Sequence, residues 1–375
     1  MKPSAQDDFF LAPDLVLLNH ASYGLASRLV TSHADRIRQQ IESDPTFFLG
    51  SHLTEHLRQA TQTAAAALNL APENTALCPN ATSGAAALIS SLPLAEDSVV
   101  VALETEYSSI LRAWEVACTR VGATMIRVPV QLPFEGPDQL LFSLEALVPG
   151  PVTYLQMSLV SSSSAIHFPV TDIADWVHRR GGRLLLDAAH GPGHVPLEPL
   201  FWGVDAVFGT LHKWFPTLRP VGFLWLHESL APHIKPAEIS LSWDSSDLIE
   251  RFSWPGTFDP VPRLSLDTAV KQWRSWHEQK LIEQCQELAD HAVDLLTSVG
   301  ARPTAAPSHL PPRLRGFVID GLSVADVKGL LQEAGVRTWV GPGTAGECIL
   351  RLSTHIYNDA SDVETVAAQL KEALS

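Results

Sequence analysis

Two apolar segments, each followed directly by polar residues, constrain the fold of this chain more than any other feature. Residues 183–186 predict a strand that ends on Asp187, and residues 206–208 predict a second strand that leads to Lys213. Ligands of open α/β sheets bind just beyond the carboxyl ends of the strands. A carboxylate and an amine at two such ends therefore predict one binding site that both strands help to form.

Apolar strands alternate with helical segments along most of the chain. This alternation predicts an α/β fold with a mostly parallel sheet that is covered by helices on both faces. The expected strands are residues 15–18, 98–103, 124–128, 152–157, 183–186, 206–208 and 221–226, and the expected helices are residues 32–43, 54–68, 85–91, 110–121, 140–147 and 173–180.

The 375 residues suffice for one large and one small domain. We expect a large domain over residues 1–263, in which residues 1–30 line the entrance to the site, and a small α+β domain over residues 264–375. A long helix over residues 265–298 is expected to form the hinge. The small domain is expected to contain strands over residues 314–319, 336–340 and 348–353, and helices over residues 324–334 and 360–374.

Composition excludes several classes of partner. A net charge of −15 without a basic cluster argues against nucleic-acid binding, which requires a basic face. Residues 1–10 lack the apolar core of a signal peptide, and no apolar run reaches membrane-spanning length. Widely spaced cysteines without a CxxC pair are typical of reduced thiols. We therefore expect a cytoplasmic protein with no membrane partner. The cysteines are Cys78, Cys118, Cys285 and Cys348.

Two motifs match ligand-binding patterns only by their letters. Residues 341–346 fit GxGxxG, but they lie between two short strands and open no helix, so we reject a dinucleotide site. His190 and His194 have the spacing of metal ligands on a helix. The intervening Gly-Pro-Gly forbids that helix and no third ligand is evident, so we expect no metal site.

The acid and the amine suggest pyridoxal 5'-phosphate (PLP) as the cofactor. PLP requires a lysine for its aldehyde, an acid for its ring nitrogen, a phosphate cradle, and an arginine for the substrate carboxylate. Lys213, Asp187, the turn at Ala81-Thr82 and Arg351 could supply these groups. Lys213 lies between apolar and small residues, which favours a lowered pKa over an ordinary solvated lysine. A plain helix cap by Thr82 or Ser83 is the alternative for the turn.

Several motifs resemble those of a known family. Asp187-Ala188-Ala189-His190 and Thr210-Leu211-His212-Lys213-Trp214 resemble the signatures of class V aminotransferases, a group of fold-type I PLP enzymes that includes cysteine desulfurases and isopenicillin N epimerase-like proteins. The resemblance extends from about Leu17 to Asp362. It implies the fold-type I PLP-dependent transferase architecture: a large domain with a mostly parallel seven-stranded sheet, and a smaller C-terminal α+β domain.

The resemblance also implies roles for individual residues. Lys213 would carry the cofactor, Asp187 would face the ring nitrogen, and His190 would lie near the ring hydroxyl. Residues implied to contact the phosphate are Ala81, Thr82, Thr210 and His212, and residues implied to contact the ring are Tyr107, which would stack on it, and Ser162, which would reach its hydroxyl.

Further segments imply substrate contacts and a dimer. Gly256 and Thr257 resemble an element that reaches the phosphate of the neighbouring subunit's cofactor, which implies a homodimer with shared sites. Arg351 resembles the arginine that binds the substrate α-carboxylate. Asn19 and His20 begin a segment that resembles the substrate-entrance turn of the epimerase-like proteins, although a turn capped by Ser22 would explain the same residues.

One absence narrows the expected reaction. Desulfurases carry a nucleophilic cysteine upstream of the carboxylate-binding arginine, whereas residues 336–347 contain none and Cys348 is too close to Arg351. We expect an enzyme that acts on an amino acid or a related substrate through an external aldimine and a quinonoid, as a C–S or other β-eliminating lyase or as an epimerase. A class V aminotransferase and a non-catalytic PLP-binding regulator or scaffold are the alternatives. His20, Tyr107 and His190 are candidates for a second acid or base.

Overall fold

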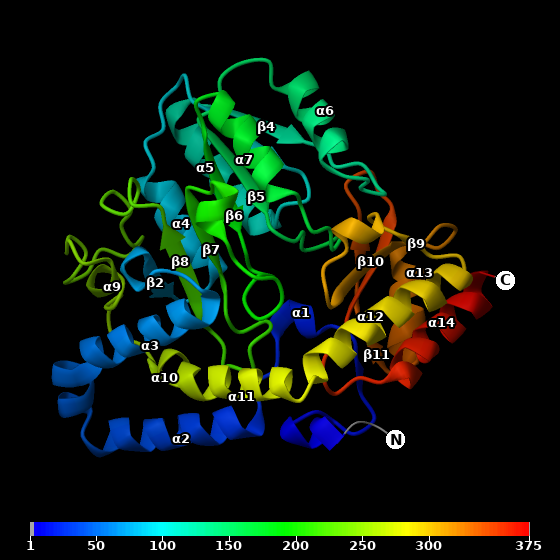
Figure 1. The fold of residues 1–375 in the computed structure, drawn as a ribbon, viewed down its shortest axis with the longest axis horizontal. Helices are drawn as coiled ribbons and strands as arrows, with labels where there is room; N and C mark the ends of the chain where they lie inside the picture. The colour runs from blue at the N-terminus through cyan, green and yellow to red at the C-terminus, as the bar shows by residue number, and fades with distance from the viewer. Residues whose placement is uncertain (1–3, 375) are drawn as a thin grey trace.

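A seven-stranded sheet forms the centre of the molecule, with the strand order β2-β8-β7-β6-β5-β3-β4 (Figure 1). The computed structural model describes residues 4–374. β8 is antiparallel to both of its neighbours, and the other pairs are parallel. The strands are β2 (Thr75–Cys78), β3 (Val99–Leu103), β4 (Thr124–Val128), β5 (Tyr154–Ser158), β6 (Arg183–Asp187), β7 (Ala206–Thr210) and β8 (Gly222–Leu226). The predicted α/β class with a mostly parallel sheet is confirmed.

Helices cover both faces of this sheet. α6 and α7 contribute to one hydrophobic cluster, and α4 and α5 contribute to the cluster on the opposite face. The helices before the C-terminal region are α1 (His20–Tyr23), α2 (Arg28–Ser43), α3 (Leu53–Leu68), α4 (Ala81–Ser91), α5 (Ser108–Val121), α6 (Pro137–Leu147), α7 (Val170–Arg179), α8 (Pro199–Trp202), α9 (Leu248–Arg251) and α10 (Val261–Leu264), with a π-helical turn at Thr46–His52 and short 3-10 turns at Ser4–Asp8 and Pro72–Asn74.

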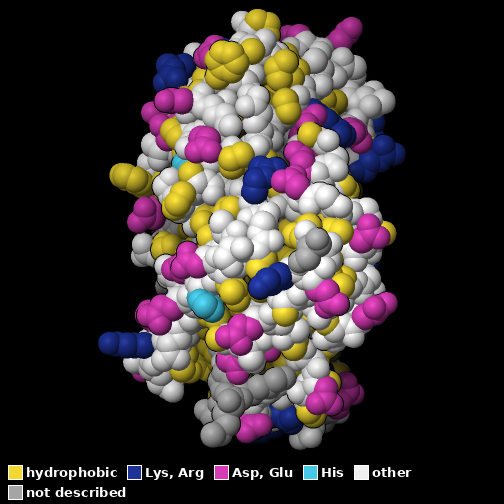
Figure 2. Space-filling view, turned by 90° about the vertical axis from the view of Figure 1, so that its right-hand side faces the viewer, with side chains coloured by type: hydrophobic (Ala, Val, Ile, Leu, Met, Phe, Trp, Pro, Cys, Tyr) yellow, Lys and Arg dark blue, Asp and Glu magenta, His cyan; other side chains and the backbone are white. Residues whose placement is uncertain are grey.

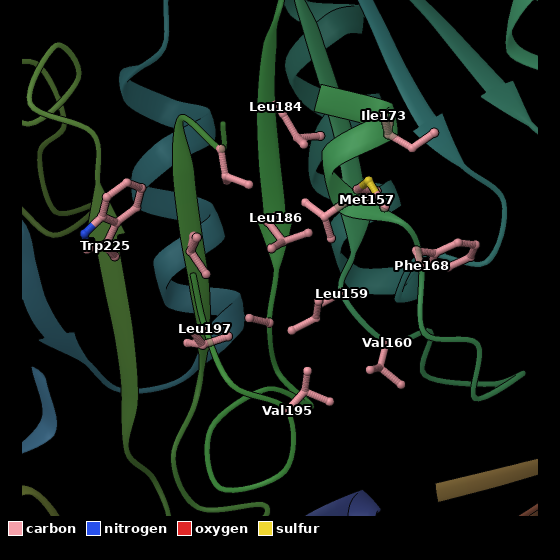
Figure 3. Packing of buried hydrophobic residues seen from close by; sticks show 14 of the residues in the cluster. Met157, Leu159, Val160, Phe168, Ile173, Leu184, Leu186, Val195, Leu197 and Trp225 are labelled. Atoms are coloured by element: carbon pink, nitrogen blue, oxygen red, sulfur yellow. The ribbon is translucent and has the colours of Figure 1, made fainter. Parts of the chain in front are cut away.

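The alternation of side chains along β6 explains how the sheet separates its core from the site. Leu184 and Leu186 pack beside Met157 of β5 and Ile173 of α7 (Figure 3). Because successive side chains of a strand point to opposite faces, Asp187 lies on the other face, which α4 and α5 cover. Burial on both faces is why this strand is an uninterrupted apolar run.

A second, smaller sheet lies in the C-terminal part of the chain, with the order β12-β13-β10-β9 and antiparallel pairing throughout. β1 pairs in parallel with β11, so the N-terminal segment joins this part of the molecule. The elements are β1 (Val16–Leu17), β9 (Arg302–Pro303), β10 (Leu314–Val318), β11 (Val336–Arg337), β12 (Trp339–Pro342), β13 (Cys348–Ser353), α13 (Val324–Glu333), α14 (Ala360–Leu374) and a 3-10 turn at Pro307–His309. The predicted smaller α+β part is confirmed.

The single helix predicted over residues 265–298 is wrong. The chain forms α11 (Leu266–Glu278) and α12 (Leu281–Ser298), and Lys280 between them is left-handed with φ +58°. α11 packs along α2 and α3 (Figure 1). α12 instead packs against α14 and β10. Different packing partners therefore separate two helices that no proline or glycine divides. The domain division after residue 263 stays a prediction.

Within residues 4–374, none of the helices combines the length and the apolar character needed to cross a bilayer. On the face that Figure 2 shows, Lys and Arg side chains are scattered among Asp and Glu and form no basic patch.

Candidate active site

A cavity of about 390 Å³ opens at the carboxyl ends of β5, β6 and β7. It collects residues from the central sheet, from the start of α4, from α1 and from the C-terminal sheet. Most of the residues predicted for the site therefore meet in one place. Those that line the cavity are Ala81, Thr82, Tyr107, Ser162, Asp187, His190, Thr210, His212, Lys213 and Arg351.

Lys213 supplies the amine. Its Nζ lies 3.2 Å from Nε2 of His190. Burial lowers the pKa of Lys213 to about 8, and the charge of Arg351 acts in the same direction while that of Asp187 opposes it. Burial also holds the pKa of His190 well below its usual value. His190 is therefore a neutral imidazole that can accept a hydrogen bond, and a larger fraction of the Lys213 amine is unprotonated near neutral pH than in a solvated lysine.

Asp187 supplies the carboxylate. Its Oδ1 accepts a hydrogen bond from the backbone N–H of Ala189 over 2.7 Å, which fixes the side chain at the strand end. Burial raises the pKa of Asp187 to about 6, and the Ala189 N–H and the Lys213 charge oppose this shift. A cationic ring nitrogen beside the carboxylate would stabilise its charge further.

The start of α4 supplies an anion cradle. Oδ1 of Asn80 accepts from the N–H of Ser83 over 2.9 Å, so Asn80 is the helix cap and the alternative cap by Thr82 or Ser83 is wrong. The N–H groups of a helix's first turn favour anions, and here Ala81 and Thr82 begin the helix at the cavity. Gly222 is required for this arrangement, because a Cβ there would lie 2.6 Å from Cα of Asn80.

Thr210 and His212 border the cradle from the lysine side. The hydroxyl of Thr210 donates to the carbonyl of Ala189 over 3.3 Å. Nδ1 of His212 lies 2.9 Å from the carbonyl oxygen and 3.1 Å from the nitrogen of Val221. The backbone of this residue, which directly precedes β8, therefore fixes the ring. Burial lowers the pKa of His212 to about 4, which leaves it neutral.

Arg351 is a buried cation with neutral partners. One terminal nitrogen donates to Oδ1 of Asn19 over 3.1 Å and to Oγ of Ser22 over 2.7 Å, and the other donates to the carbonyl of Ser162. Its guanidinium lies 5.4 Å from the ring centre of Trp339. Within residues 4–374 it forms no ion pair, and burial lowers its pKa to about 10. A buried guanidinium without a counter-charge favours a carboxylate ligand.

Four predicted residues do not line the cavity, and of these Asn19 still contacts Arg351 through a hydrogen bond. His20 does not line the cavity: its Nδ1 is 2.9 Å from the hydroxyl of Tyr357, and its ring stacks on His355 with 3.8 Å between centroids. Burial lowers the pKa of His20 to about 3, so this geometry gives it no acid role near neutral pH. Gly256 and Thr257 lie in the excursion after β8 and do not line this cavity.

The sequence did not single out several residues that the structure places at the site. Ser22 and Tyr23 line the cavity from α1, and Trp339 lines it from β12. Glu106 is a buried acid just beyond β3, only 5% exposed. It lies three residues after the apolar strand β3, so its position was a weaker signal than that of Asp187, the last residue of β6. No sequence pattern indicated Trp339. It reaches the site because β12 pairs with β13, which sets Trp339 opposite Arg351.

Gly24 joins the entrance segment to the lysine loop. Its φ is +66°, and a Cβ there would lie 1.9 Å from the carbonyl oxygen of His212 and 2.9 Å from that of Lys213. We expect Gly24→Ala to destabilise the protein by about 2 kcal/mol or more, since it adds both backbone strain and overpacking. Thermal unfolding measures this loss. The control is Gly150→Ala, because a Cβ at Gly150 meets nothing within 4 Å. Equal stabilities of the two variants would contradict the prediction.

Comparison with known proteins agrees with this geometry. Residues 40–366 match the family Aminotransferase class-V. The chain is 26% identical to isopenicillin N epimerase of Amycolatopsis lactamdurans over 98% of each protein. The apo cysteine desulfurase of Thermococcus onnurineus NA1 is similar with a TM-score of 0.82 and 16% identity, over 100% of this chain and 98% of that one. A C-DES variant with glycine covalently linked to its PLP cofactor gives a TM-score of 0.81 and 19% identity, over 99% of each chain. These matches confirm the predicted fold type I.

Proposed function

Because the chain belongs to the class-V aminotransferase family, whose members are PLP-dependent enzymes, we propose that it binds PLP and acts on an amino acid or an amino-acid-derived substrate. The observation that carries this proposal is the meeting of Lys213 and Asp187 in one cavity with an anion cradle and an unpaired buried arginine. Each of these groups would satisfy one requirement of the cofactor or of its substrate.

The residues present fit the cofactor. Lys213 would hold the aldehyde, Asp187 the ring nitrogen, and the start of α4 with Thr210 and His212 the phosphate. Nδ1 of His190 is buried without a hydrogen-bond partner among the residues that the structure describes, which leaves a polar atom for a ligand group. When bound, PLP supplies an aldehyde that links to amines and a ring that withdraws electrons from the substrate's α-carbon.

The chain's own groups bind, orient and move protons. Arg351 binds the substrate α-carboxylate and so fixes which bond of the α-carbon can break. Nζ of Lys213 takes the α-proton, since its lowered pKa matches the working pH of a general base. His190, 3.2 Å away, orients this amine through Nε2. Asp187 keeps a negative charge where the ring nitrogen carries its proton.

We favour a β-eliminating C–S lyase or an epimerase over an aminotransferase. The similarity to isopenicillin N epimerase over nearly the whole chain supports this choice. A persulfide mechanism is disfavoured, because Cys348 is buried in β13 and burial raises the pKa of its thiol, which opposes formation of a nucleophilic thiolate. Class-V transamination is the alternative.

Hydrogen exchange distinguishes these functions. The protein reconstituted with PLP should exchange the α-proton of at least one amino acid into deuterated solvent. Release of a keto acid with ammonia and thiol then indicates elimination, inverted configuration at the α-carbon indicates epimerisation, and a keto acid formed with an aminated cofactor indicates transamination. Absence of exchange with every amino acid would favour the non-catalytic regulator or scaffold and contradict the proposal.

We also propose a homodimer with shared sites. Gly256 and Thr257 lie outside their own cavity, in an excursion whose Ile239 and Leu241 are 83% and 89% exposed. Apolar side chains this exposed are more common in interfaces than on free surfaces. The cytoplasmic location stays a prediction, and the four free, buried cysteines agree with it.

Replacement of Arg351 tests substrate binding. We expect Arg351→Gln to lower kcat/KM for an amino acid by about 10- to 150-fold, because a charge-assisted hydrogen bond contributes about 1.5–3 kcal/mol. The same substrate as its neutral α-amide should lose much less. Exchange rates for acid and amide give this ratio directly. Arg337→Gln, on the surface of β11, is the matched control. Equal losses for acid and amide would show that Arg351 does not bind the carboxylate.

A further inference from the structure

A second buried carboxyl group lies near enough to Asp187 to be influenced by its charge. Glu106 follows β3 and is 5% exposed, as is Asp187. The mechanism proposed above assigns it no role. A buried acid that is not paired with a cation is costly, so its placement beside the site requires an explanation.

The sheet brings the two acids to the same face. Ser158 of β5 pairs with Asp187 of β6, so their side chains point in the same direction, and Gln156, two residues before Ser158, shares that face. Nε2 of Gln156 lies 3.3 Å from Oε2 of Glu106. Glu106 thus reaches this face from the end of β3 and contacts the strand that adjoins Asp187.

A donor-only group fixes the orientation of the Gln156 amide. Nε1 of Trp114, which can only donate, lies 3.4 Å from Oε1 of Gln156. The amide nitrogen must therefore point the other way, toward Glu106 and toward the carbonyl of Met157. Oε2 of Glu106 consequently accepts a hydrogen bond, whereas its Oε1 is buried without a hydrogen-bond partner among the described residues.

The surroundings decide which acid keeps its charge. Asp187 has the Ala189 N–H and the Lys213 amine to stabilise an anion. Glu106 is hydrogen-bonded by the neutral Gln156, and within residues 4–374 no arginine or lysine forms an ion pair with it. Burial and then the charge of Asp187 raise the pKa of Glu106 to about 8, although hydrogen bonds from Ser158 and Gln156 act in the opposite direction. Each of two neighbouring buried carboxyl groups disfavours ionisation of the other, so their protons leave at different pH values.

We propose that Glu106 is a positioning residue that holds one proton beside Asp187, so that the pair carries a single negative charge and Asp187 keeps it for the cofactor ring. The role toward the ring rests on the proposed function, but the proton on Glu106 does not. As the pH rises through the titration of Glu106, the pair gains a second charge. The second negative charge would raise the pKa of the cofactor's ring nitrogen, which would then keep its proton to a higher pH.

Infrared spectroscopy of the apo-protein tests the proton directly. At about pH 7 the wild type should show a carboxylic-acid C=O band that disappears as the pH rises toward about 9. Glu106→Gln, which keeps the shape and the neutral charge, should lose the band. Glu104→Gln, two residues earlier and outside the buried pair, should retain it. A band at pH 7 that survives in Glu106→Gln, or no such band in the wild type, would overturn the proposal.

A second variant leaves Glu106 itself intact. Asp187→Asn removes the neighbouring charge, so the Glu106 band should titrate at a lower pH than in the wild type. An unchanged midpoint would mean that the two acids are not coupled. With PLP bound, the visible absorption of the wild type should respond to alkaline pH, and that response should be lost in Glu106→Gln. If Glu106→Gln loses the apo-protein band as expected but the wild type does not bind PLP, only the proposed function is refuted.

Discussion

Replacement of Lys213 by alanine is expected to abolish the visible absorption band that the protein acquires with PLP. The amine on this side chain is the group that would link to the cofactor's aldehyde, and within the described residues no other lysine lines the cavity. The same change removes the general base for the α-proton. We therefore expect hydrogen exchange to fall by about 10³-fold or more, since acid–base and covalent catalysis act through one atom here.

Two measurements and a control separate these effects. Absorption spectra after reconstitution report the covalent link, and deuterium incorporation into an amino acid reports proton removal. Lys271→Ala provides the control, because Lys271 lies on the surface and pairs with Asp267. Lys213→Arg retains a positive charge without a suitable nucleophile, so it should behave like the alanine variant. A normal spectrum in Lys213→Ala would exclude Lys213 as the cofactor lysine.

The second large effect is expected from Asp187→Asn. The amide oxygen can still accept the Ala189 N–H, so the strand end should keep its conformation. The negative charge for the ring nitrogen is lost, however, and the ring then withdraws electrons less effectively. We expect a fall of about 10² to 10³-fold in the rate of α-proton exchange, the range typical when a preorganised electrostatic group is removed.

The cofactor should still bind to this variant, because Lys213 and the cradle at α4 are unchanged. Titration with PLP therefore separates binding from turnover. Asp172→Asn, at the start of α7 and exposed to solvent, tests for a general effect of losing an aspartate. Wild-type exchange rates in Asp187→Asn would show that the ring nitrogen needs no anionic partner in this protein.

The parts of the site that the sequence predicts are those set by local patterns. Asp187 and Lys213 follow apolar strands, and the turn before α4 precedes a helix of small residues, so strand ends and helix starts could be located without coordinates. The role of Glu106 could not, because it depends on Gln156 of another strand and on Trp114 of α5.

Two features that the sequence did not locate have a common physical origin. The break at Lys280 has no proline or glycine to mark it and follows from the packing of α11 and α12 against different parts of the protein. His20 resembled an entrance residue by its neighbours in the chain, yet its ring is buried against His355. In both cases contacts between distant segments decided the outcome, and such contacts leave no periodic pattern in the sequence.

The tie between Arg351 and the entrance segment has a consequence for biosynthesis. Arg351 donates to Asn19 and Ser22, which lie 332 and 329 residues earlier, and β1 pairs with β11. During translation the central sheet can form while the entrance segment still lacks its partners. The carboxylate-binding corner is completed only when the last strand leaves the ribosome, so a nascent chain can assemble the cradle and lysine before it can bind substrate.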